Sequence, residues 1–234
     1  MEGDESGESN DDLQLSLLNV SGEEGPEPGS LRLFLDTTRG RINAIGHPVE
    51  GGTGAIVCSG MVGPAGGVYG RLPTLLRPYG ITVLRLAERV PSNLEECVLD
   101  VLAGCSFLQG VGAEGIVVLG HSFGGAVAVG AGGLHPLVKG IVAMSSQLHG
   151  TRKVHLHHVP LLLVHGGSDG VLHYDASEDI YARANDPKRL ELYEEAGHSL
   201  MGIEDRLDAL LTEWIPARLA GEPMVSSRME HPRP

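Results

Sequence analysis

The sequence predicts an α/β fold, in which helices cover both faces of a mostly parallel, doubly wound β-sheet. Between residues 54 and 219, short apolar segments of strand length alternate with longer segments of helical periodicity. Strands that are apolar along their whole length are typical of parallel sheets, since both faces of such a sheet are buried. At 234 residues and 41% apolar content, the chain is long enough for one sizeable core. We therefore expect a single α/β domain over residues 30–219.

The segment before this domain, residues 1–29, is strongly acidic. It carries nine acidic residues and no Lys or Arg, and so accounts for most of the formal net charge of −13. Such a composition buries too little apolar surface to offset the entropy of ordering, which predicts a disordered, solvated tail. Two alternatives stay open: the apolar patch at 13–20 docks as a strand or helical turn, or the segment is a partner-binding arm.

The domain is expected to begin with an antiparallel hairpin. Residues 31–38 and 41–49 have strand character and are joined by a tight turn at Arg39-Gly40. The later elements alternate as the α/β pattern requires: strand 54–60, helix 67–80, strand 81–87, helix 91–112, strand 115–120, helix 123–135, strand 138–146, strand 159–166, helix 175–185, strand 189–195 and helix 201–219. Residues 220–234, rich in Pro and Ser, are expected to form a flexible C-terminal tail.

The helix at 91–112 has a clear start signal. Ser92 directly precedes its helically spaced apolar residues, and Glu95 follows three positions later. This is the spacing of a capping box, in which a hydroxyl and a carboxylate satisfy the first backbone N–H groups of a helix. We therefore expect Ser92 to be the N-cap.

Composition argues against several classes of protein. The chain has no run of about 18 apolar residues that would span a membrane. Its N-terminus lacks the basic start and apolar stretch of a secretory signal, so we expect a soluble cytoplasmic protein. No basic patch or aromatic platform indicates a nucleic-acid partner. Cys58, Cys97 and Cys105 have no CxxC spacing, and we expect buried, reduced thiols.

Three reactive side chains follow predicted strands directly. Ser122, Asp169 and His198 each lie within a few residues of the end of a predicted strand, namely 115–120, 159–166 and 189–195. Since functional groups gather at the carboxyl ends of parallel strands, we expect these side chains to meet. A serine hydroxyl needs an imidazole to take its proton, and the imidazole needs a carboxylate to orient it and balance its charge. The set therefore predicts a nucleophile, a base and an acid.

The residues around Ser122 fit a sharp turn from strand to helix. Gly120 and Gly124, two positions before and after, let such a turn close without side-chain collision. The backbone N–H of Phe123, at the start of the following helix, is then placed to stabilise an oxyanion. A glycine-rich turn without chemistry is the alternative. A phosphate cradle is disfavoured, because neither GxGxxG nor GxxxxGK[ST] is present.

With these residues the chain resembles the α/β-hydrolase superfamily over roughly residues 31–219. The stretch GHSFG matches the family's nucleophile elbow, and the order Ser122, Asp169, His198 matches its triad order. The resemblance implies a serine hydrolase that cleaves a carboxylic ester or thioester through an acyl-enzyme intermediate, with no cofactor and no metal. A peptidase or amidase with the same triad is one alternative. A non-catalytic binding protein of the same fold is another.

The resemblance also implies a second oxyanion donor in the loop after the strand at 54–60. Ser59-Gly60 stands where the family often has His-Gly, and the HGGG form is absent. The backbone N–H of Met61 is the expected donor, with Val62 as the alternative one residue further on.

No cap domain is expected. Where the family inserts one, this chain has only the short segment 146–158. The compact, lidless architecture resembles that of the dienelactone hydrolases, although those have a Cys nucleophile where this chain has Ser122.

Some charged residues have more than one interpretation. Asp175 and Asp179 lie near enough in sequence to replace Asp169 as the acid. Arg85 and Arg89 lie in and just after the strand at 81–87, where they could bind a substrate carboxylate. Solvated surface arginines are the alternative for both.

The other histidines are not expected to be catalytic. His121 should pack beside the nucleophile, and His165 should be a core histidine with satisfied hydrogen bonds. His155, His157 and His158 lack the spacing of a metal site, and no cysteine or acid joins them.

Overall fold

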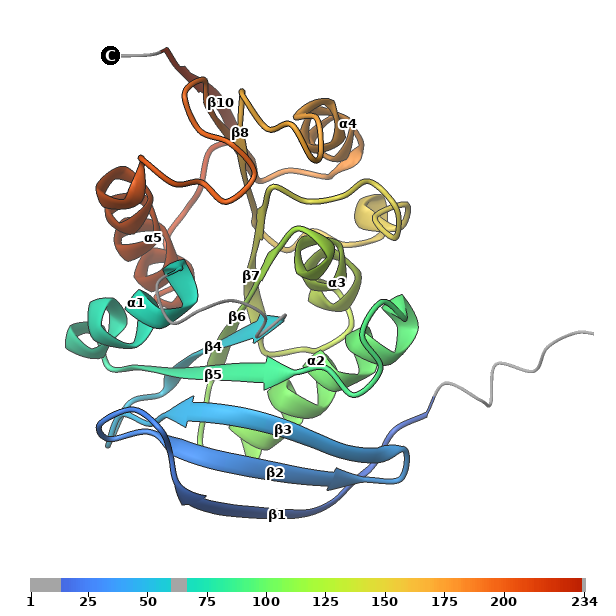
Figure 1. The fold of residues 1–234 in the computed structure, drawn as a ribbon, viewed down its shortest axis with the longest axis vertical. Coiled ribbons are helices and arrows are strands. Elements are labelled where there is room, and N and C mark those ends of the chain that lie inside the picture. The colour runs from blue at the N-terminus through green and yellow to red at the C-terminus, as the bar shows by residue number, and fades with distance from the viewer. Residues whose placement is uncertain (1–13, 60–66, 233–234) are drawn as a thin grey trace, which may run out of the picture.

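The computed structural model describes residues 14–59 and 67–232, which form a β-sheet flanked by helices (Figure 1). The strands are β1 (Leu17–Glu24), β2 (Leu31–Thr37), β3 (Gly40–His47), β4 (Gly54–Ser59), β5 (Ile81–Ala87), β6 (Gly115–His121), β7 (Val138–Met144), β8 (Leu161–Gly166), β9 (Lys188–Tyr193) and β10 (Ser227–His231). The helices are α1 (Val68–Leu76), α2 (Leu94–Gly110), α3 (Phe123–Gly132), α4 (Asp175–Arg183) and α5 (Glu204–Leu219), with the 3₁₀ turns η2 (Arg77–Tyr79) and η3 (Val154–Leu156).

The ten described strands form one sheet in the order β1-β2-β3-β5-β4-β6-β7-β8-β9-β10. β1, β2 and β3 pair antiparallel with one another, and β3 also pairs antiparallel with β5. From β5 to β10 every neighbouring pair is parallel. The prediction of a mostly parallel sheet with an antiparallel N-terminal hairpin is therefore confirmed.

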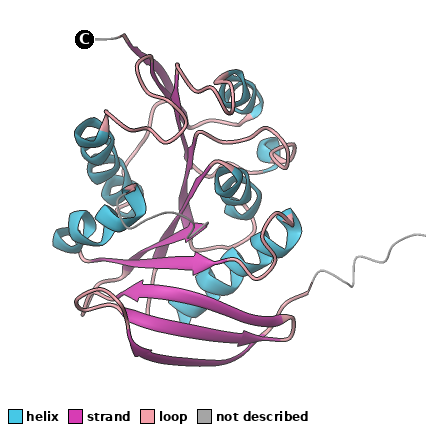
Figure 2. Ribbon diagram, viewed as in Figure 1, coloured by secondary structure: helices cyan, strands magenta, loops and turns pink. Residues whose placement is uncertain are grey.

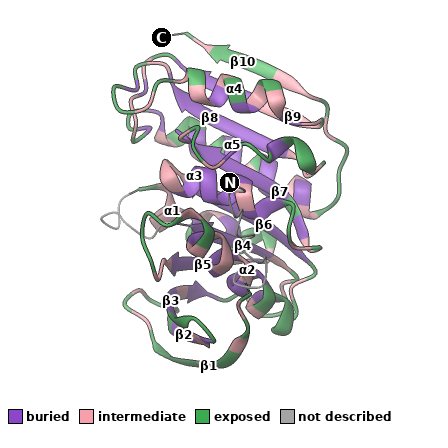
Figure 3. Ribbon diagram, turned by 90° about the vertical axis from the view of Figure 1, so that its right-hand side faces the viewer, coloured by how far each residue is buried: buried purple, intermediate pink, exposed green. Residues whose placement is uncertain are grey.

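Helices cover both faces of the sheet (Figure 2). Helices α2, α3 and α4 pack on one face and α1 and α5 on the other, so that two hydrophobic clusters form. The side chains of β6 alternate between them: Ile116 and Val118 enter the first cluster, Val117 and Leu119 the second. A strand buried on both faces is apolar along its whole length, which is the pattern that the sequence showed. Figure 3 shows this burial in the central strands.

The expectation of a disordered tail over residues 1–29 is wrong for its second half. Residues 17–24 form β1, which pairs with β2 from Leu17 opposite Thr37 to Glu24 opposite Leu31. Leu17 and Val20 are partly buried against the first hydrophobic cluster. The open edge of β2 supplies the backbone hydrogen bonds that pair it with β1. The apolar patch at 13–20 supplies the hydrophobic contact, which the acidic residues of the segment cannot make. Residues 1–13 lie outside the described part of the chain.

The C-terminal segment 220–234 is not wholly a flexible tail either. Residues 227–231 form β10, which adds to the sheet parallel to β9. The ring of His231 stacks on that of Tyr193, with centroids 4.4 Å apart, and pairs with the buried carboxylate of Glu191. These contacts fasten a strand that is exposed along most of its length.

Helix α2 begins one residue later than expected. Asn93 is the N-cap, and its side chain accepts a hydrogen bond from the backbone N–H of Glu96 at 3.1 Å. Ser92 lies outside the helix with φ of 72°. An Asn side chain caps as well as a Ser hydroxyl, so the two positions were equally plausible from sequence.

All three cysteines are free and buried, as expected. Burial raises the pKa of each of the thiols of Cys58, Cys97 and Cys105 to about 12. They are therefore uncharged core residues.

Within residues 14–59 and 67–232, no cap domain covers the sheet. Between the end of β7 at Met144 and the start of β8 at Leu161, the chain forms only loop and the short turn η3. Among residues 14–59 and 67–232, no helix combines the length and apolar character that a membrane span requires.

Candidate active site

Ser122 lies in the turn between β6 and α3, in a backbone conformation that side chains rarely adopt. Its φ is 58° and its ψ is −120°, which is strained for a residue with a side chain. The two flanking glycines make the turn possible. A Cβ on Gly120 would lie 1.8 Å from the carbonyl oxygen of Gly124, and one on Gly124 would lie 2.6 Å from that of Ser59. The turn therefore has the geometry of a nucleophile elbow.

His198 bridges the serine and a carboxylate. It lies in the loop after β9, and its side chain is 22% exposed. Its Nε2 is 3.1 Å from the hydroxyl oxygen of Ser122, and its Nδ1 is 2.8 Å from Oδ2 of Asp169. Both distances are those of hydrogen bonds, with Ser122 donating to Nε2 and Nδ1 donating to Asp169.

Asp169 is held in the loop after β8, with its side chain fully buried. The backbone N–H groups of Val171 and Leu172 donate to Oδ1 at 2.8 and 2.9 Å. Burial on its own raises the pKa of this carboxyl. The hydrogen bonds from Leu172, His198 and Val171 outweigh burial and hold the pKa below its ordinary value. The group is therefore a charged carboxylate at neutral pH.

The two alternative acids have other partners. Asp175 lies 3.0 Å from the ring of His173, and Asp179 accepts a hydrogen bond from Arg183 at 2.7 Å. Of the three acids weighed from sequence, Asp169 is the one that contacts His198.

His121 packs beside the nucleophile, as expected, and also contacts the loop of His198. Its Nε2 lies 2.6 Å from the backbone carbonyl oxygen of His198, and the two imidazole rings are 4.8 Å apart between centroids. Sequence reasoning placed the ring near the elbow but missed this bond, since nothing in the sequence relates residue 121 to residue 198.

Two further side chains that sequence reasoning did not single out, Tyr69 of α1 and Glu88 after β5, contact Ser59 at the end of β4. The hydroxyl of Tyr69 donates to the carbonyl oxygen of Ser59 at 3.0 Å, and the hydroxyl of Ser59 donates to Glu88 at 2.9 Å. Burial raises the pKa of Glu88. These contacts fix the strand end that lies against Gly124 in the elbow.

The two predicted oxyanion donors come from different segments of the chain, of which the structure describes one. Phe123 is the first residue of α3, where backbone N–H groups have no acceptor within the helix. This agrees with the place predicted for the first donor. Met61 and its alternative Val62 lie outside the described residues.

Arg85 and Arg89, the candidates for binding a substrate carboxylate, both have buried side chains that pair with acids of the chain itself, so neither is a solvated surface arginine. Arg85 is 6% exposed, pairs with Glu27 and lies 3.3 Å from the ring of His47. Glu27 belongs to the N-terminal segment that was expected to be disordered, so sequence reasoning could not supply it as a partner.

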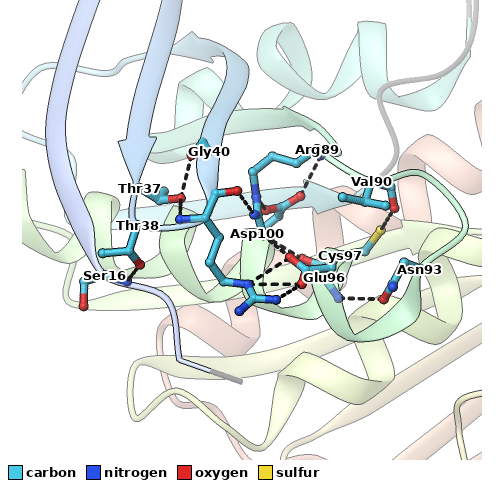
Figure 4. A network of polar contacts seen from close by, with 11 residues as sticks. Ser16, Thr37, Thr38, Gly40, Arg89, Val90, Asn93, Glu96, Cys97 and Asp100 are labelled. Carbon is cyan, nitrogen blue, oxygen red and sulfur yellow. Dashed lines mark hydrogen bonds and ion pairs between the residues drawn. The ribbon is translucent and has the colours of Figure 1, made fainter. Parts of the chain in front are cut away.

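Arg89 is bound within the network that Figure 4 shows. Its side chain, 5% exposed, pairs with the fully buried carboxylate of Asp100 and, at 2.8 Å, with Glu96. Its backbone N–H donates to Asp100 at 2.8 Å. The guanidinium therefore neutralises the chain's own acids.

His165 is a core histidine, as expected. It is fully buried, with Nδ1 2.7 Å from the hydroxyl of Ser177 and Nε2 3.0 Å from the carbonyl oxygen of Leu172. Among the described residues, which include His155, His157 and His158, no three His, Cys, Asp or Glu side chains converge as a metal site requires.

Known proteins share part of this sequence and its fold. A family model described as serine aminopeptidase, S33, matches residues 149–205, which include Asp169 and His198. No curated protein matches the sequence.

Several solved structures match the fold. Est1E from Butyrivibrio proteoclasticus has a TM-score of 0.66 at 16% identity, over 80% of this chain and 98% of its own. A dienelactone hydrolase from Anabaena variabilis has a TM-score of 0.66 at 18% identity, over 76% of this chain and 92% of its own. Acetyl xylan esterase 1 from Thermoanaerobacterium has a TM-score of 0.62 at 15% identity, over 83% of this chain and 87% of its own. The chain therefore has the α/β-hydrolase fold.

Proposed function

We propose that the protein is a serine hydrolase that cleaves a carboxylic ester or thioester through an acyl-enzyme intermediate. The observation that carries the proposal is the continuous line of contacts from Ser122 through His198 to Asp169, at 3.1 and 2.8 Å. A buried carboxylate, an imidazole and a hydroxyl in this order are what nucleophilic catalysis by serine requires.

In the first step, the hydroxyl oxygen of Ser122 attacks the carbonyl carbon of the substrate while Nε2 of His198 takes its proton. The positive charge that develops on the imidazole is balanced by Asp169, which also keeps the remaining proton on Nδ1. His198 then returns the proton to the departing alcohol or thiol.

The negative charge that develops on the carbonyl oxygen needs donors aimed at it. The N–H of Phe123, together with the positive end of the α3 dipole, supplies one. Met61 is the predicted source of the second donor.

In the second step, water attacks the acyl group on Ser122. His198 takes a proton from this water and returns it to the serine, so that the acid leaves and the resting state is restored. Every proton in the cycle is carried by side chains of the chain itself.

Ester cleavage is favoured by the kind of protein that shares the fold. The acetyl xylan esterases act on esters by their names, and Est1E has been solved with ferulic acid bound. No cap domain lies between β7 and β8, which favours substrates with a bulky leaving group.

Amide or peptide cleavage is the second candidate. It is favoured by the serine aminopeptidase model, whose matched region includes two members of the triad. A non-catalytic binding protein is the third, with the acidic N-terminal segment as its partner arm. A cytoplasmic location stays part of the proposal.

Labelling with a fluorophosphonate probe tests the serine chemistry. The wild type and the control Ser106→Ala, which removes an exposed hydroxyl on α2, should be labelled, whereas Ser122→Ala should not. If the wild type is not labelled, the serine hydrolase proposal is wrong and the non-catalytic binding protein becomes the favoured candidate. Turnover of p-nitrophenyl esters, acyl thioesters and aminoacyl anilides then separates the candidate substrate classes.

A further inference from the structure

A second histidine reaches the carboxylate of Asp169. Nε2 of His165 lies 3.2 Å from Oδ2, the same oxygen that accepts the bond from His198. Both side chains in this contact are fully buried. His165 belongs to β8 and precedes Asp169 by four residues. The strand whose following loop holds the acid therefore also supplies the second histidine that contacts it.

The protonation of the His165 ring follows from its partners. The carbonyl oxygen of Leu172, 3.0 Å from Nε2, is only an acceptor, so Nε2 carries a proton. The hydroxyl of Ser177 lies 2.7 Å from Nδ1 and donates to it. Burial lowers the pKa of His165, which keeps the ring neutral. The ring therefore presents a fixed N–H dipole to Asp169 and no competing charge.

Leu172 links His165 to the other oxygen of the same carboxylate. Its carbonyl oxygen accepts from His165, while its N–H donates to Oδ1 of Asp169 at 2.9 Å. One imidazole thus acts on both oxygens: on Oδ2 by direct contact, and on Oδ1 by fixing the peptide that donates to it.

The position of His165 is itself tightly fixed. A Cβ on the next residue, Gly166, would lie 2.3 Å from the carbonyl oxygen of Ala196, so the end of β8 packs directly on the loop that carries His198. The backbone N–H of Ser168 donates to the same carbonyl at 3.0 Å. The loops of the acid and of the base are therefore joined at this point.

We propose that His165 is a positioning residue, which holds the carboxylate of Asp169 so that Oδ2 faces Nδ1 of His198. It acts through Asp169, since the groups that its ring nitrogens contact are Asp169, Leu172 and Ser177. This role rests on the proposed function, since it concerns the geometry of the same triad. Groups that fix the rotamer of an active-site side chain matter because small displacements are costly to rate.

Three variants test the role. His165→Leu removes both ring nitrogens, while His165→Gln keeps an N–H donor near the place of Nε2. Leu163→Ala is the matched control, because Leu163 lies two residues earlier on the same face of β8 and is fully buried in the first hydrophobic cluster. Its loss should lower stability without touching Asp169.

We expect His165→Leu to lower kcat by up to about 100-fold with KM unchanged, and His165→Gln to recover most of the loss. The acidic limb of the pH profile should move to lower pH in the Leu variant alone, since a misaligned carboxylate stabilises the protonated base less. Leu163→Ala should keep both the wild-type kcat and the wild-type pH profile. If His165→Leu behaves like Leu163→Ala in kcat and in the pH profile, the positioning role is wrong.

A measurement without turnover separates this proposal from the proposed function. The proton on Nδ1 of His198, bonded to Asp169, should give a low-field NMR resonance in the wild type and in His165→Gln. It should shift or disappear in His165→Leu. A wild type that is inactive and unlabelled would overturn the hydrolase proposal, while an unchanged resonance in the Leu variant would overturn only the role of His165.

Discussion

The imidazole of His121 donates a hydrogen bond to the backbone carbonyl of His198 over 2.6 Å. Burial lowers the pKa of His121, so its ring is neutral, and the carbonyl requires the single proton to be on Nε2. The residue before the nucleophile therefore fastens the loop that carries the base. This loop includes Leu200, whose φ of 55° is unusual for a residue with a side chain.

The first prediction concerns this bond. His121→Phe keeps an aromatic ring beside His198 but removes the donor, so the loop at 196–202 should become more mobile. One lost hydrogen bond is worth about 1 kcal/mol, or roughly fivefold in kcat. Kinetics and amide hydrogen exchange of the loop measure both effects. His135→Phe, at the far end of α3, should change neither, and an unchanged loop in His121→Phe would contradict the prediction.

The second prediction concerns the charge of Asp169. Asp169→Asn keeps the shape of the side chain but removes the charge and presents a donor or a weaker acceptor to Nδ1 of His198. The imidazole then loses both its tautomer control and its counter-charge, and kcat should fall by roughly 10⁴-fold. Asp179→Asn, which breaks a surface pair with Arg183, is the control and should keep full activity. A similar small loss in both variants would remove Asp169 from the triad.

The third prediction concerns the elbow. In Gly124→Ala, the new Cβ would lie 2.6 Å from the carbonyl oxygen of Ser59, so the backbone of the turn or of β4 has to shift. We expect loss of both esterase activity and thermal stability. Gly110→Ala, where a Cβ meets nothing within 4 Å, should be neutral or stabilising by up to about 1 kcal/mol. Unfolding curves and kcat of both variants decide whether the two glycines differ as expected.

The fourth prediction separates structure from substrate binding at Arg89. Arg89→Leu leaves the buried Asp100 without its cation, which should cost about 3–5 kcal/mol of unfolding free energy. Arg41→Leu, which breaks an exposed pair with Asp36, should leave the unfolding free energy almost unchanged, because solvent screens the pair. KM for esters that carry a carboxylate should stay unchanged in the folded fraction of Arg89→Leu. A raised KM for these substrates alone would restore the substrate-binding role.

Ser122 and Asp169 were predictable from sequence because each follows a strand that is apolar on both faces, whereas β9 before His198 also carries the buried Glu191. Such strands are short, uninterrupted and ended by glycine, so their carboxyl ends can be located to within a few residues. The parallel topology then brings Ser122, Asp169 and His198 to one edge without further information.

The outer strands could not be predicted in the same way. Most positions of β1 and β10 are exposed, and outside the apolar patch at 13–20 they show neither an apolar run nor a clean alternation. What holds them is a free sheet edge, which is a property of the assembled fold and not of the local sequence. The ion pair between Arg85 and Glu27 could not be predicted for a related reason. The two residues lie 58 positions apart, and nothing in the local sequence relates them.

The fifth prediction concerns stability at low pH. Burial lowers the pKa of His157, as it does for other histidines of the chain, namely His47, His121, His135 and His165. A neutral buried ring stabilises the fold above the unfolded-state pKa of about 6.5, and this stability is lost as pH falls below that value, because the unfolded chain then binds more protons. The free energy of unfolding should therefore decrease between pH 7 and pH 5.

His157→Leu isolates one of these groups. The ring of His157 packs against Gly133, away from the triad, so the variant should fold and keep its activity. Its unfolding free energy should fall less steeply with decreasing pH than that of the wild type, by up to about 1.4 kcal/mol per pH unit. Denaturant unfolding at several pH values measures the slopes. The exposed His155→Asn is the control and should keep the wild-type slope, and an equally steep slope in His157→Leu would show that its ring is not held neutral by burial.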